Sequence, residues 1–314
     1  MKLLVTGASG FIGRNVLLRA PRDWTITAVY HQTTDLPAFV RDRGLAHVTA
    51  VGCDLSSATD VAALVNRCGR ADALLHLAAN GDPAASADRP RWDLELNTVA
   101  LLNLLEHQPA DRVVYVSSGA VYDGLRGAVT PATPVHPLLP YAVAKLASER
   151  YVAFFAERRR TIASYANIRF FGAYGPYEAP RKITTRWLRA IMAGDRTFTI
   201  RGNGQNLIDF MYVDDAVDAM LRVVADRAFS GTVDLASQAP VTIDAMAATM
   251  ARAVGVDVTV RHEGHVEEYI EFASADDTMR TRFGFAPTIA FEDGIARLHR
   301  FLSTSNQQPA TSNR

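Results

Sequence analysis

Cysteine is scarce in this chain of 314 residues, and neither sign of charge is in excess. Cys53 and Cys68 are too few for a disulfide framework and lack the spacing of metal ligands, which favours free thiols in a reducing compartment. The 33 basic residues equal the 33 acidic ones, so nothing indicates a nucleic-acid or anionic membrane partner. No apolar run reaches the ~20 residues that span a bilayer. These absences predict a cytoplasmic protein that binds neither nucleic acid nor membrane and holds no metal.

A glycine-rich turn close to the N-terminus is the most informative feature that is present. Gly7, Gly10 and Gly13 follow the apolar run Leu3–Val5 directly. A strand that ends in such a turn and opens into a helix lets the backbone approach a pyrophosphate, and the helix N-terminus offers free N–H groups and a positive dipole end. The same glycines, taken alone, also fit a purely structural strand-to-helix turn.

Short apolar segments alternate with amphipathic ones through the first half of the chain. The strands are rich in Val, Ile and Leu, which is typical of parallel strands buried on both faces. The alternation predicts a Rossmann-type α/β fold with a doubly wound parallel sheet. The expected strands are Leu3–Thr6, Thr25–Tyr30, His47–Val51, Ala73–Leu77, Arg112–Ser117 and Ile162–Arg169, and the expected helices include Thr59–Cys68, Trp92–His107 and Tyr141–Arg158.

After Arg169 the regular alternation of apolar strands and amphipathic helices ends, and loops and isolated strands follow. We therefore expect a smaller α/β lobe over the carboxyl ends of the strands, which binds the substrate. The expected division is a dinucleotide-binding domain at 1–169, joined again by 205–237, a substrate lobe at 170–204 and 238–302, and a disordered polar tail at 303–314.

A tyrosine and a lysine stand four residues apart at the start of an expected helix. The i, i+4 spacing places Tyr141 and Lys145 on one helix face. A nearby ammonium favours the phenolate, which can then take a proton from a substrate hydroxyl. Ser117 and Ser118 end a strand where ligands bind in such sheets, so a serine there can bond the same hydroxyl. Taken alone, Tyr141 and Lys145 also fit a pair of side chains on the protein surface, and the two serines also fit a cap at the end of the strand.

Taken together, these motifs resemble the extended short-chain dehydrogenase/reductase family, and within it the nucleotide-sugar epimerases, dehydratases and reductases. The resemblance extends from about Met1 to Leu302. Its pieces are the glycine turn, Asp54-Leu55, His76–Ala79, Asn97, Ser117-Ser118, Tyr141 with Lys145, Arg169–Pro176 and Asp209–Asp215.

The resemblance implies a catalytic set of Ser118, Tyr141 and Lys145, and a nucleoside-diphosphate sugar as substrate. It also implies a homodimer formed through a four-helix bundle, here by Trp92–His107 and Tyr141–Arg158. Together with the glycine turn it gives the expected cofactor-binding residues, namely Gly7, Gly10, Phe11, Ile12, Gly13, Arg14, His31, Asp54, Leu55, Ala78, Ala79, Asn97, Ser117, Tyr141 and Lys145.

Departures from the family pattern narrow the expected chemistry. Dehydratases and sugar-acid decarboxylases of the family carry acidic residues just after the catalytic serine or threonine, where this chain has Gly119 and Ala120. Elimination of water needs an acid for the departing hydroxyl. The sequence therefore favours epimerisation or ketone reduction, although the later lobe can supply a carboxylate such as Glu178.

The substrate-binding pattern departs too. Ile208 replaces an arginine of the family, Gly172 replaces a substrate-facing asparagine, and the segment 262–268 lacks a second phosphate-binding arginine. A diphosphate needs cationic partners. Arg181, Lys182 and Arg201 are the candidate replacements, and a solvated basic face is the alternative. The expected substrate-binding residues are therefore Gly172, Arg181, Lys182 and Arg201.

The cofactor is expected to be NADP or NAD, with NADP favoured. NAD-preferring proteins place a carboxylate at the end of the second strand, where it binds the ribose 2′-hydroxyl. Here no carboxylate occurs between Tyr30 and Asp35. Arg14, His31 and Thr33 are the candidates for binding a 2′-phosphate.

The sequence thus predicts NAD(P)-dependent oxidoreduction of a nucleoside-diphosphate sugar, as an epimerisation, most simply at C4, through a keto intermediate. An NADPH-dependent keto-sugar reductase is the alternative. A non-catalytic dinucleotide sensor is disfavoured, because a sensor has no need of a proton donor such as Tyr141.

Overall fold

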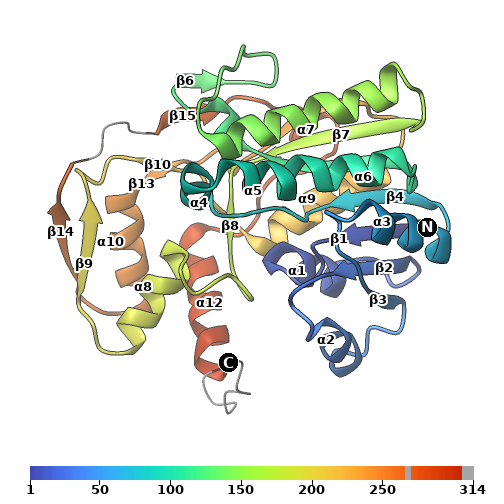
Figure 1. The fold of residues 1–314 in the computed structure, drawn as a ribbon. Coiled ribbons are helices and arrows are strands. Elements are labelled where there is room, and N and C mark those ends of the chain that lie inside the picture. The colour runs from blue at the N-terminus through green and yellow to red at the C-terminus, as the bar shows by residue number, and fades with distance from the viewer. Residues whose placement is uncertain (266–269, 306–314) are drawn as a thin grey trace.

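The computed structural model describes residues 1–265 and 270–305, and its centre is a parallel sheet of seven strands (Figure 1). The strand order is β3-β2-β1-β4-β5-β7-β12. The strands are β1 (Lys2–Thr6), β2 (Thr25–Tyr30), β3 (Val48–Gly52), β4 (Ala71–His76), β5 (Ala110–Ser118), β7 (Ser164–Phe170) and β12 (Gly231–Leu235). This order confirms the predicted Rossmann-type sheet, and the first six strands end within two residues of the expected positions.

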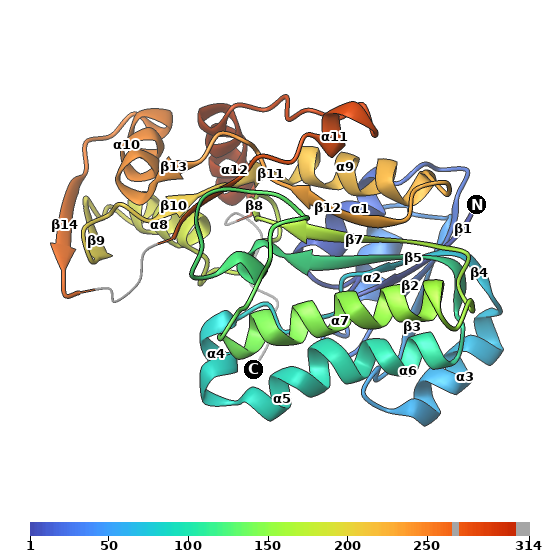
Figure 2. The ribbon, with the colours of Figure 1, turned by 90° about the horizontal axis from the view of Figure 1, so that it is seen from above.

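Helices cover both faces of the sheet (Figure 2). Side chains alternate between the faces along a strand, so Leu3 and Val5 pack into one hydrophobic core and Leu4 into another. The first core includes α1 (Phe11–Arg19), α2 (Leu36–Asp42) and α9 (Val213–Ala225), and the second includes α3 (Ala58–Cys68), α6 (Ala100–Glu106) and α7 (Pro140–Glu157). Two covered faces explain why the strands are apolar almost throughout.

The strand order reverses direction at β1, which lies between β2 and β4. Ligands of open parallel sheets bind outside the carboxyl ends of the strands at such a switch point. The glycine turn after β1 and Ser118 at the end of β5 lie at this edge. The topology thus assembles at one edge motifs that lie more than 100 residues apart.

The chain after β5 builds smaller units. Among the described residues, four two-stranded sheets lie outside the central sheet, namely β6 (Arg126–Val129) with β15 (Glu271–Ser274), β8 (Ala173–Tyr174) with β11 (Met211–Tyr212), β9 (Thr197–Arg201) with β14 (Thr259–Glu263), and β10 (Leu207–Ile208) with β13 (Val241–Thr242). The remaining helices are α4 (Pro83–Asp88), α5 (Pro90–Leu94), α8 (Ile183–Met192), α10 (Ile243–Val254), α11 (Thr278–Thr281) and α12 (Phe291–Ser305). In Figure 1, β9, β14, α8 and α10 stand away from the central sheet.

The expected α/β lobe after Arg169 contains α8, α10 and α12, helices of 10 to 15 residues whose bounds the sequence analysis did not give and whose buried side chains recur at helical spacing. One expectation for this part of the chain is wrong. The tail was expected to be disordered from Ser303, but α12 continues to Ser305 because Leu302 is buried and the Ser303 hydroxyl donates to the carbonyl of His299. Residues 306–314 lie outside the described part.

The expected helix 92–107 is not regular. It runs from α5 through a π-helical turn at Glu95–Val99 into α6. Such turns are frequent at functional sites, and this one contains Asn97. Among the described residues, no helix is long and apolar enough to cross a membrane.

Candidate active site

A long cleft follows the carboxyl edge of the sheet. One cavity, of about 310 Å³, lies at the ends of β1, β2 and β3, and a second, of about 550 Å³, extends to Ser118, Tyr141 and Lys145. Gly7, Gly10, Leu77 and Ala79 line both cavities. The two cavities therefore form one elongated site with the glycine turn at its middle.

The glycine turn leaves no room for side chains on its inner side. A Cβ at Gly7 would lie 2.7 Å from the amide nitrogen of Ala78, and a Cβ at Gly13 would overlap the carbonyl oxygen of Gly7. Gly7 also has a φ of 64°, in the left-handed region that favours glycine. No side chain caps the start of α1, so its first N–H groups are open to an anion. A dinucleotide pyrophosphate fits this turn, as the sequence predicts.

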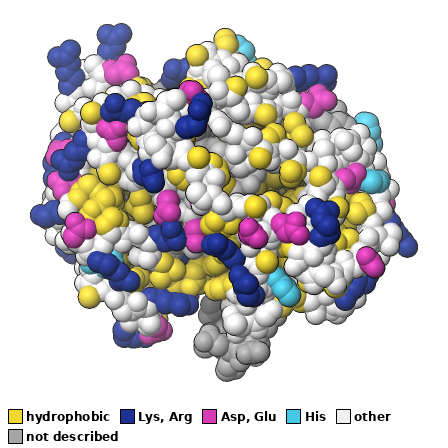
Figure 3. Space-filling model, turned by 180° about the vertical axis from the view of Figure 1, so that it is seen from behind, with side chains coloured by type: hydrophobic (Ala, Val, Ile, Leu, Met, Phe, Trp, Pro, Cys, Tyr) yellow, Lys and Arg dark blue, Asp and Glu magenta, His cyan; other side chains and the backbone are white. Residues whose placement is uncertain are grey.

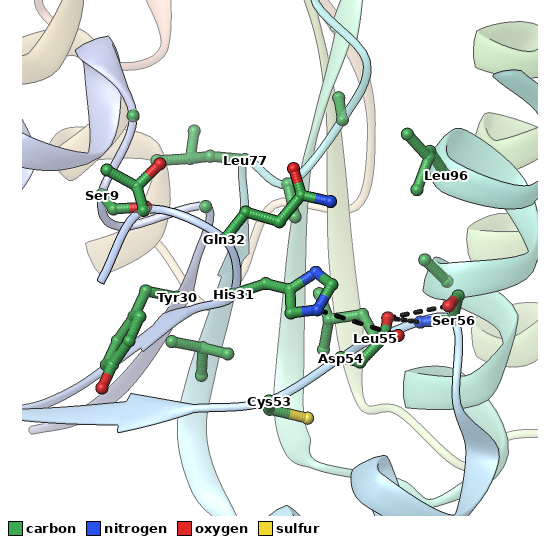
Figure 4. Close-up of a pocket in the computed structure, with 17 residues that line it drawn as sticks. Ser9, Tyr30, His31, Gln32, Cys53, Asp54, Leu55, Ser56, Leu77 and Leu96 are labelled. Atoms are coloured by element: carbon green, nitrogen blue, oxygen red, sulfur yellow. Dashed lines mark hydrogen bonds and ion pairs between the residues drawn. The ribbon is translucent and has the colours of Figure 1, made fainter. Parts of the chain in front are cut away.

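The first cavity has polar side chains where β2 and β3 end (Figure 4). Asp54 accepts hydrogen bonds from the Ser56 hydroxyl and amide at 2.7 and 2.9 Å, and these bonds lower the pKa of Asp54. The His31 ring points toward Asp54, with 3.9 Å between Nε2 and Oδ2. Leu55 and Ala78 line the same cavity.

Two expected cofactor-binding residues lie outside both cavities. Arg14 bonds to Asp35 and to the carbonyl of Ser9, and its guanidinium lies 4.7 Å from the centre of the Phe39 ring. Asn97 is buried, and its amide donates to Asp93 at 2.7 Å. Neither side chain lines the cleft. In contrast Gln32, which the sequence analysis did not select, lines it beside His31.

Tyr141, Ser118 and Lys145 meet in the second cavity. Lys145 is only 3% exposed, so this is not a surface pair. The Lys145 Nζ donates to the carbonyl of Val116 at 3.0 Å and lies 5.7 Å from the centre of the Tyr141 ring. Burial lowers the pKa of Lys145 to about 8, and burial raises the pKa of Tyr141 while a hydrogen bond with Ser118 lowers it. A phenol held by a hydroxyl beside a buried lysine can exchange a proton with a substrate hydroxyl.

A buried carboxylate behind the cavity wall was missed by the sequence analysis. Asp93 is fully buried and accepts hydrogen bonds from Asn80 at 2.8 Å and from Asn97. Its charge raises the pKa of Lys145 against the effect of burial. Asp93 and Asn97 stand four residues apart on an otherwise apolar helix face, and that polar pair is the signal that could have revealed them.

The hydroxyl of Ser117 is directed to α7. It donates to Glu149 at 2.6 Å, and Glu149 forms a buried ion pair with Arg169 at 2.9 Å. Ser117 lines the second cavity but has no free hydroxyl hydrogen for a ligand. This leaves Ser118 as the serine whose hydroxyl meets Tyr141.

Two phenylalanine rings occupy the space into which side chains at positions 119 and 172 would project. A Cβ on Gly119 would lie 3.1 Å from the Phe171 ring, and a Cβ on Gly172 would lie 2.5 Å from Phe210. Phe171, Gly172 and Phe210 all line the second cavity. The residue after Ser118 therefore cannot carry a carboxylate unless Phe171 moves.

Arg181 and Lys182 line the second cavity. Arg181 pairs with Asp82 at 3.4 Å, and the Lys182 ammonium donates to the carbonyl of Gly81 at 3.2 Å. Arg201 is exposed at the end of β9 and lines neither cavity. Two of the three expected cations are thus brought to the site.

The described residues hold no cluster of three or more His, Cys, Asp or Glu that could bind a metal. His262 bonds to Asp244 at 2.9 Å, and residues 266–268 of the same acidic segment lie outside the described part. On the face seen in Figure 3, basic and acidic side chains are interspersed, without a field of one sign.

Comparisons with known proteins agree on one family. The family model described as "NAD dependent epimerase/dehydratase family" matches residues 3–234. A dTDP-glucose 4,6-dehydratase of Mycobacterium tuberculosis is 30% identical over 76% of this chain and 72% of its own length. A UDP-glucose 4-epimerase of Mycolicibacterium smegmatis is 27% identical over 98% of this chain and 100% of its own length. Among solved structures, MoeE5 in complex with UDP-glucose and NAD superposes with a TM-score of 0.84 at 26% identity, covering 98% of this chain and 100% of that one.

The geometry of the glycine turn predicts that one negative charge at position 10 abolishes dinucleotide binding. Gly10 has an ordinary negative φ, and a Cβ there would meet only the carbonyl of Gly7 at 3.2 Å, so Gly10→Asp should fold. Its carboxylate would lie where the pyrophosphate approaches, and isothermal titration should find dinucleotide affinity lost. Gly10→Ala is the matched control and should bind far better. Equal affinity in wild type and Gly10→Asp would mean that the turn is only structural.

Proposed function

Because the chain belongs to the NAD dependent epimerase/dehydratase family, we propose that it epimerises one carbon, C4, of a nucleoside-diphosphate sugar through a keto intermediate. The observation that carries this proposal is the meeting of Ser118, Tyr141 and Lys145 in one cleft with the glycine turn. The proposal accounts for a buried proton-transfer group beside a dinucleotide site.

The two half-reactions use the same side chains in opposite directions. The bound dinucleotide supplies the acceptor, and later the donor, of a hydride. Tyr141 Oη takes the proton of the C4 hydroxyl as the hydride leaves C4, and it returns that proton as the hydride comes back to the opposite face of the ketone. The Lys145 ammonium favours the phenolate form of Tyr141 before the first step and again after the second, and Ser118 donates a hydrogen bond to the sugar oxygen. Proton and hydride both return, so the reaction is an isomerisation.

Epimerisation is preferred over dehydration because of the packing after Ser118. Removing water requires a proton donor for the departing hydroxyl, and such acids are carboxyl groups with a tuned pKa. Gly119 packs against Phe171 and Ala120 has no polar group, so neither supplies that acid. The dehydratases among the relatives make this difference the main point to test.

For the diphosphate, we propose Arg181 and Lys182 as the cations. They line the cavity that contains Tyr141, while Ile208 stands where the family has an arginine. Their partners Asp82 and the Gly81 carbonyl are weaker acceptors than a diphosphate, so the substrate can compete for both side chains. At Gly172, the Phe210 ring fills the space that a side chain would need, so this part of the cavity wall is aromatic.

A homodimer is the proposed assembly, formed by α5, α6 and α7 against the same helices of a second copy. Leu94, Val143, Tyr151 and Phe154 lie on these helices and are between 41% and 46% exposed, which is unusual for such large apolar side chains. Two copies would complete a four-helix bundle over them. Sedimentation equilibrium at micromolar concentration should give twice the chain mass, and a monomer would contradict the proposal.

Loss of the catalytic phenol should slow the reaction strongly. Tyr141→Phe keeps the ring and its packing but removes the group that moves the proton, so turnover should fall roughly 10²- to 10⁴-fold. Dinucleotide binding, measured by titration, should persist because the glycine turn is intact. Turnover near the wild-type rate would show that Tyr141 is not the proton-transfer group.

The product identifies the reaction. Purified protein is incubated with UDP-, dTDP-, GDP- or CDP-hexoses and either dinucleotide, with mass followed by spectrometry and isomers by chromatography. We expect isomer change at constant mass. Gain of two hydrogens on a supplied keto-sugar would support the reductase alternative instead, and loss of one water at an enzymatic rate would contradict both readings.

The cofactor preference follows from the end of β2. Of the residues that follow β2, His31, Gln32 and Thr33 line the cavity and none is a carboxylate, while Asp35 is paired with Arg14 outside the cavity. The nearby carboxylate is that of Asp54 after β3, 3.9 Å from His31 Nε2. We propose that NADP(H) binds at least as well as NAD(H), and side-by-side titrations test this. His31→Gln should weaken NADP(H) selectively, whereas Arg14→Met should leave the ratio unchanged. A strong wild-type preference for NAD(H) would reject the proposal.

A further inference from the structure

Glu178 is the one acidic residue among the described residues that line the cavity of Ser118 and Tyr141. It is 9% exposed and lies in the loop that leads into α8. The proton transfer derived above does not use it. A buried carboxylate without a role in that chemistry needs another reason to face a ligand cavity.

The two oxygens of Glu178 are in different situations. Oε2 accepts three hydrogen bonds, from the Thr184 hydroxyl at 2.6 Å and from the hydroxyl and amide of Thr185 at 2.5 and 3.3 Å. These bonds fasten the carboxylate to the first turn of α8. No described residue donates to Oε1. The side chain is therefore fixed by one oxygen, while the other is free to accept a hydrogen bond from a ligand.

The surroundings of Glu178 offer a sugar few other acceptors. Phe171, Gly172, Ala179, Ile183 and Phe210 line the same cavity, and none of them has a polar side chain. Sugar hydroxyls that leave water without finding acceptors weaken binding. An acceptor that is already held in place gives a hydrogen bond without a further loss of side-chain entropy.

We propose that Glu178 Oε1 accepts a hydrogen bond from a sugar hydroxyl other than the one that Tyr141 deprotonates, and so determines which sugars are accepted. This rests on the proposed function, because it requires a sugar in this cavity. Glu178 then acts as a specificity residue and takes no part in proton transfer. Sugars that lack this hydroxyl leave the carboxylate desolvated and unpaired, and are rejected.

The test variant is Glu178→Gln. The Thr185 amide needs an acceptor, so the glutamine oxygen should stay on α8 and its NH₂ group should face the cavity, where it cannot accept a hydroxyl hydrogen. Thr185→Val is the matched control, since it removes a bond to Oε2 and leaves Oε1 unchanged. Thermal unfolding of all three proteins reports any loss of fold.

The assay uses the hexose nucleotide that wild type turns over, together with its 2-, 3- and 6-deoxy analogues. In wild type, one analogue should show a KM raised roughly 10- to 100-fold, as expected for a lost hydrogen bond to a charged group. In Glu178→Gln, the KM of the parent sugar should rise by a similar factor, kcat should change little, and discrimination against that analogue should disappear. Thr185→Val should behave like wild type.

Three results overturn the inference. The first is a KM for the parent sugar that is unchanged in Glu178→Gln. The second is a Glu178→Gln variant that still discriminates fully against the deoxy analogue. The third is an equal loss of activity toward all sugars in Glu178→Gln and Thr185→Val, together with lowered thermal stability. The last result would assign Glu178 to the support of α8 alone. Absence of turnover of every nucleotide sugar by wild type would instead reject the proposed function itself.

Discussion

Close contact between two backbone segments, the glycine turn after β1 and the segment after β4, sets the geometry of the whole site. The Thr6 hydroxyl forms a hydrogen bond with His76 Nδ1 at 2.9 Å. It also accepts hydrogen bonds from the backbone amides of Leu77 and Ala78 at 3.2 and 3.3 Å. This places Gly7 so near Ala78 that no side chain fits between them. The cleft passes over this junction, and both of its cavities share residues from the two segments.

Helix α7 connects the proposed chemistry to the rest of the fold. Tyr141 and Lys145 on its first turns face the cleft, and Glu149 one turn later pairs with Arg169 on β7. A buried ion pair is costly to break because the remaining charge stays uncompensated, so α7 is held in register against the sheet. The same helix exposes Tyr151 and Phe154 on its other side, where we propose that the second copy binds.

The sheet and the positions of its motifs could be predicted because each depends on local pattern. Short apolar strands and the turn at Gly7 are readable from neighbouring residues, and the order of strands follows from the general topology of such folds. The bounds of the helices after Arg169 were not predicted, although α8 buries Thr184, Trp187, Leu188 and Ile191 at helical spacing. In α8, the polar residues between these buried side chains obscured the helical periodicity of the sequence.

The details of the site depend on contacts that no local pattern reveals. Arg14 was a candidate for binding a phosphate because it follows the glycine turn, but Asp35 and Phe39 hold it outside the cavities. The loss of space at Gly119 comes from Phe171, 52 residues later in the chain. Catalytic roles, cofactor preference and dimerisation stay predictions, since they concern molecules that bind to this chain.

The central claim is that the hydrogen removed from the sugar carbon returns to the same carbon. A nucleotide sugar carrying deuterium at C4 tests it, with conversion in ordinary water and the product analysed by mass spectrometry and NMR. Transfer to the dinucleotide and back predicts an epimer that keeps its deuterium at C4, because Tyr141 exchanges only the hydroxyl proton. An epimer that has lost the deuterium to solvent would contradict the account.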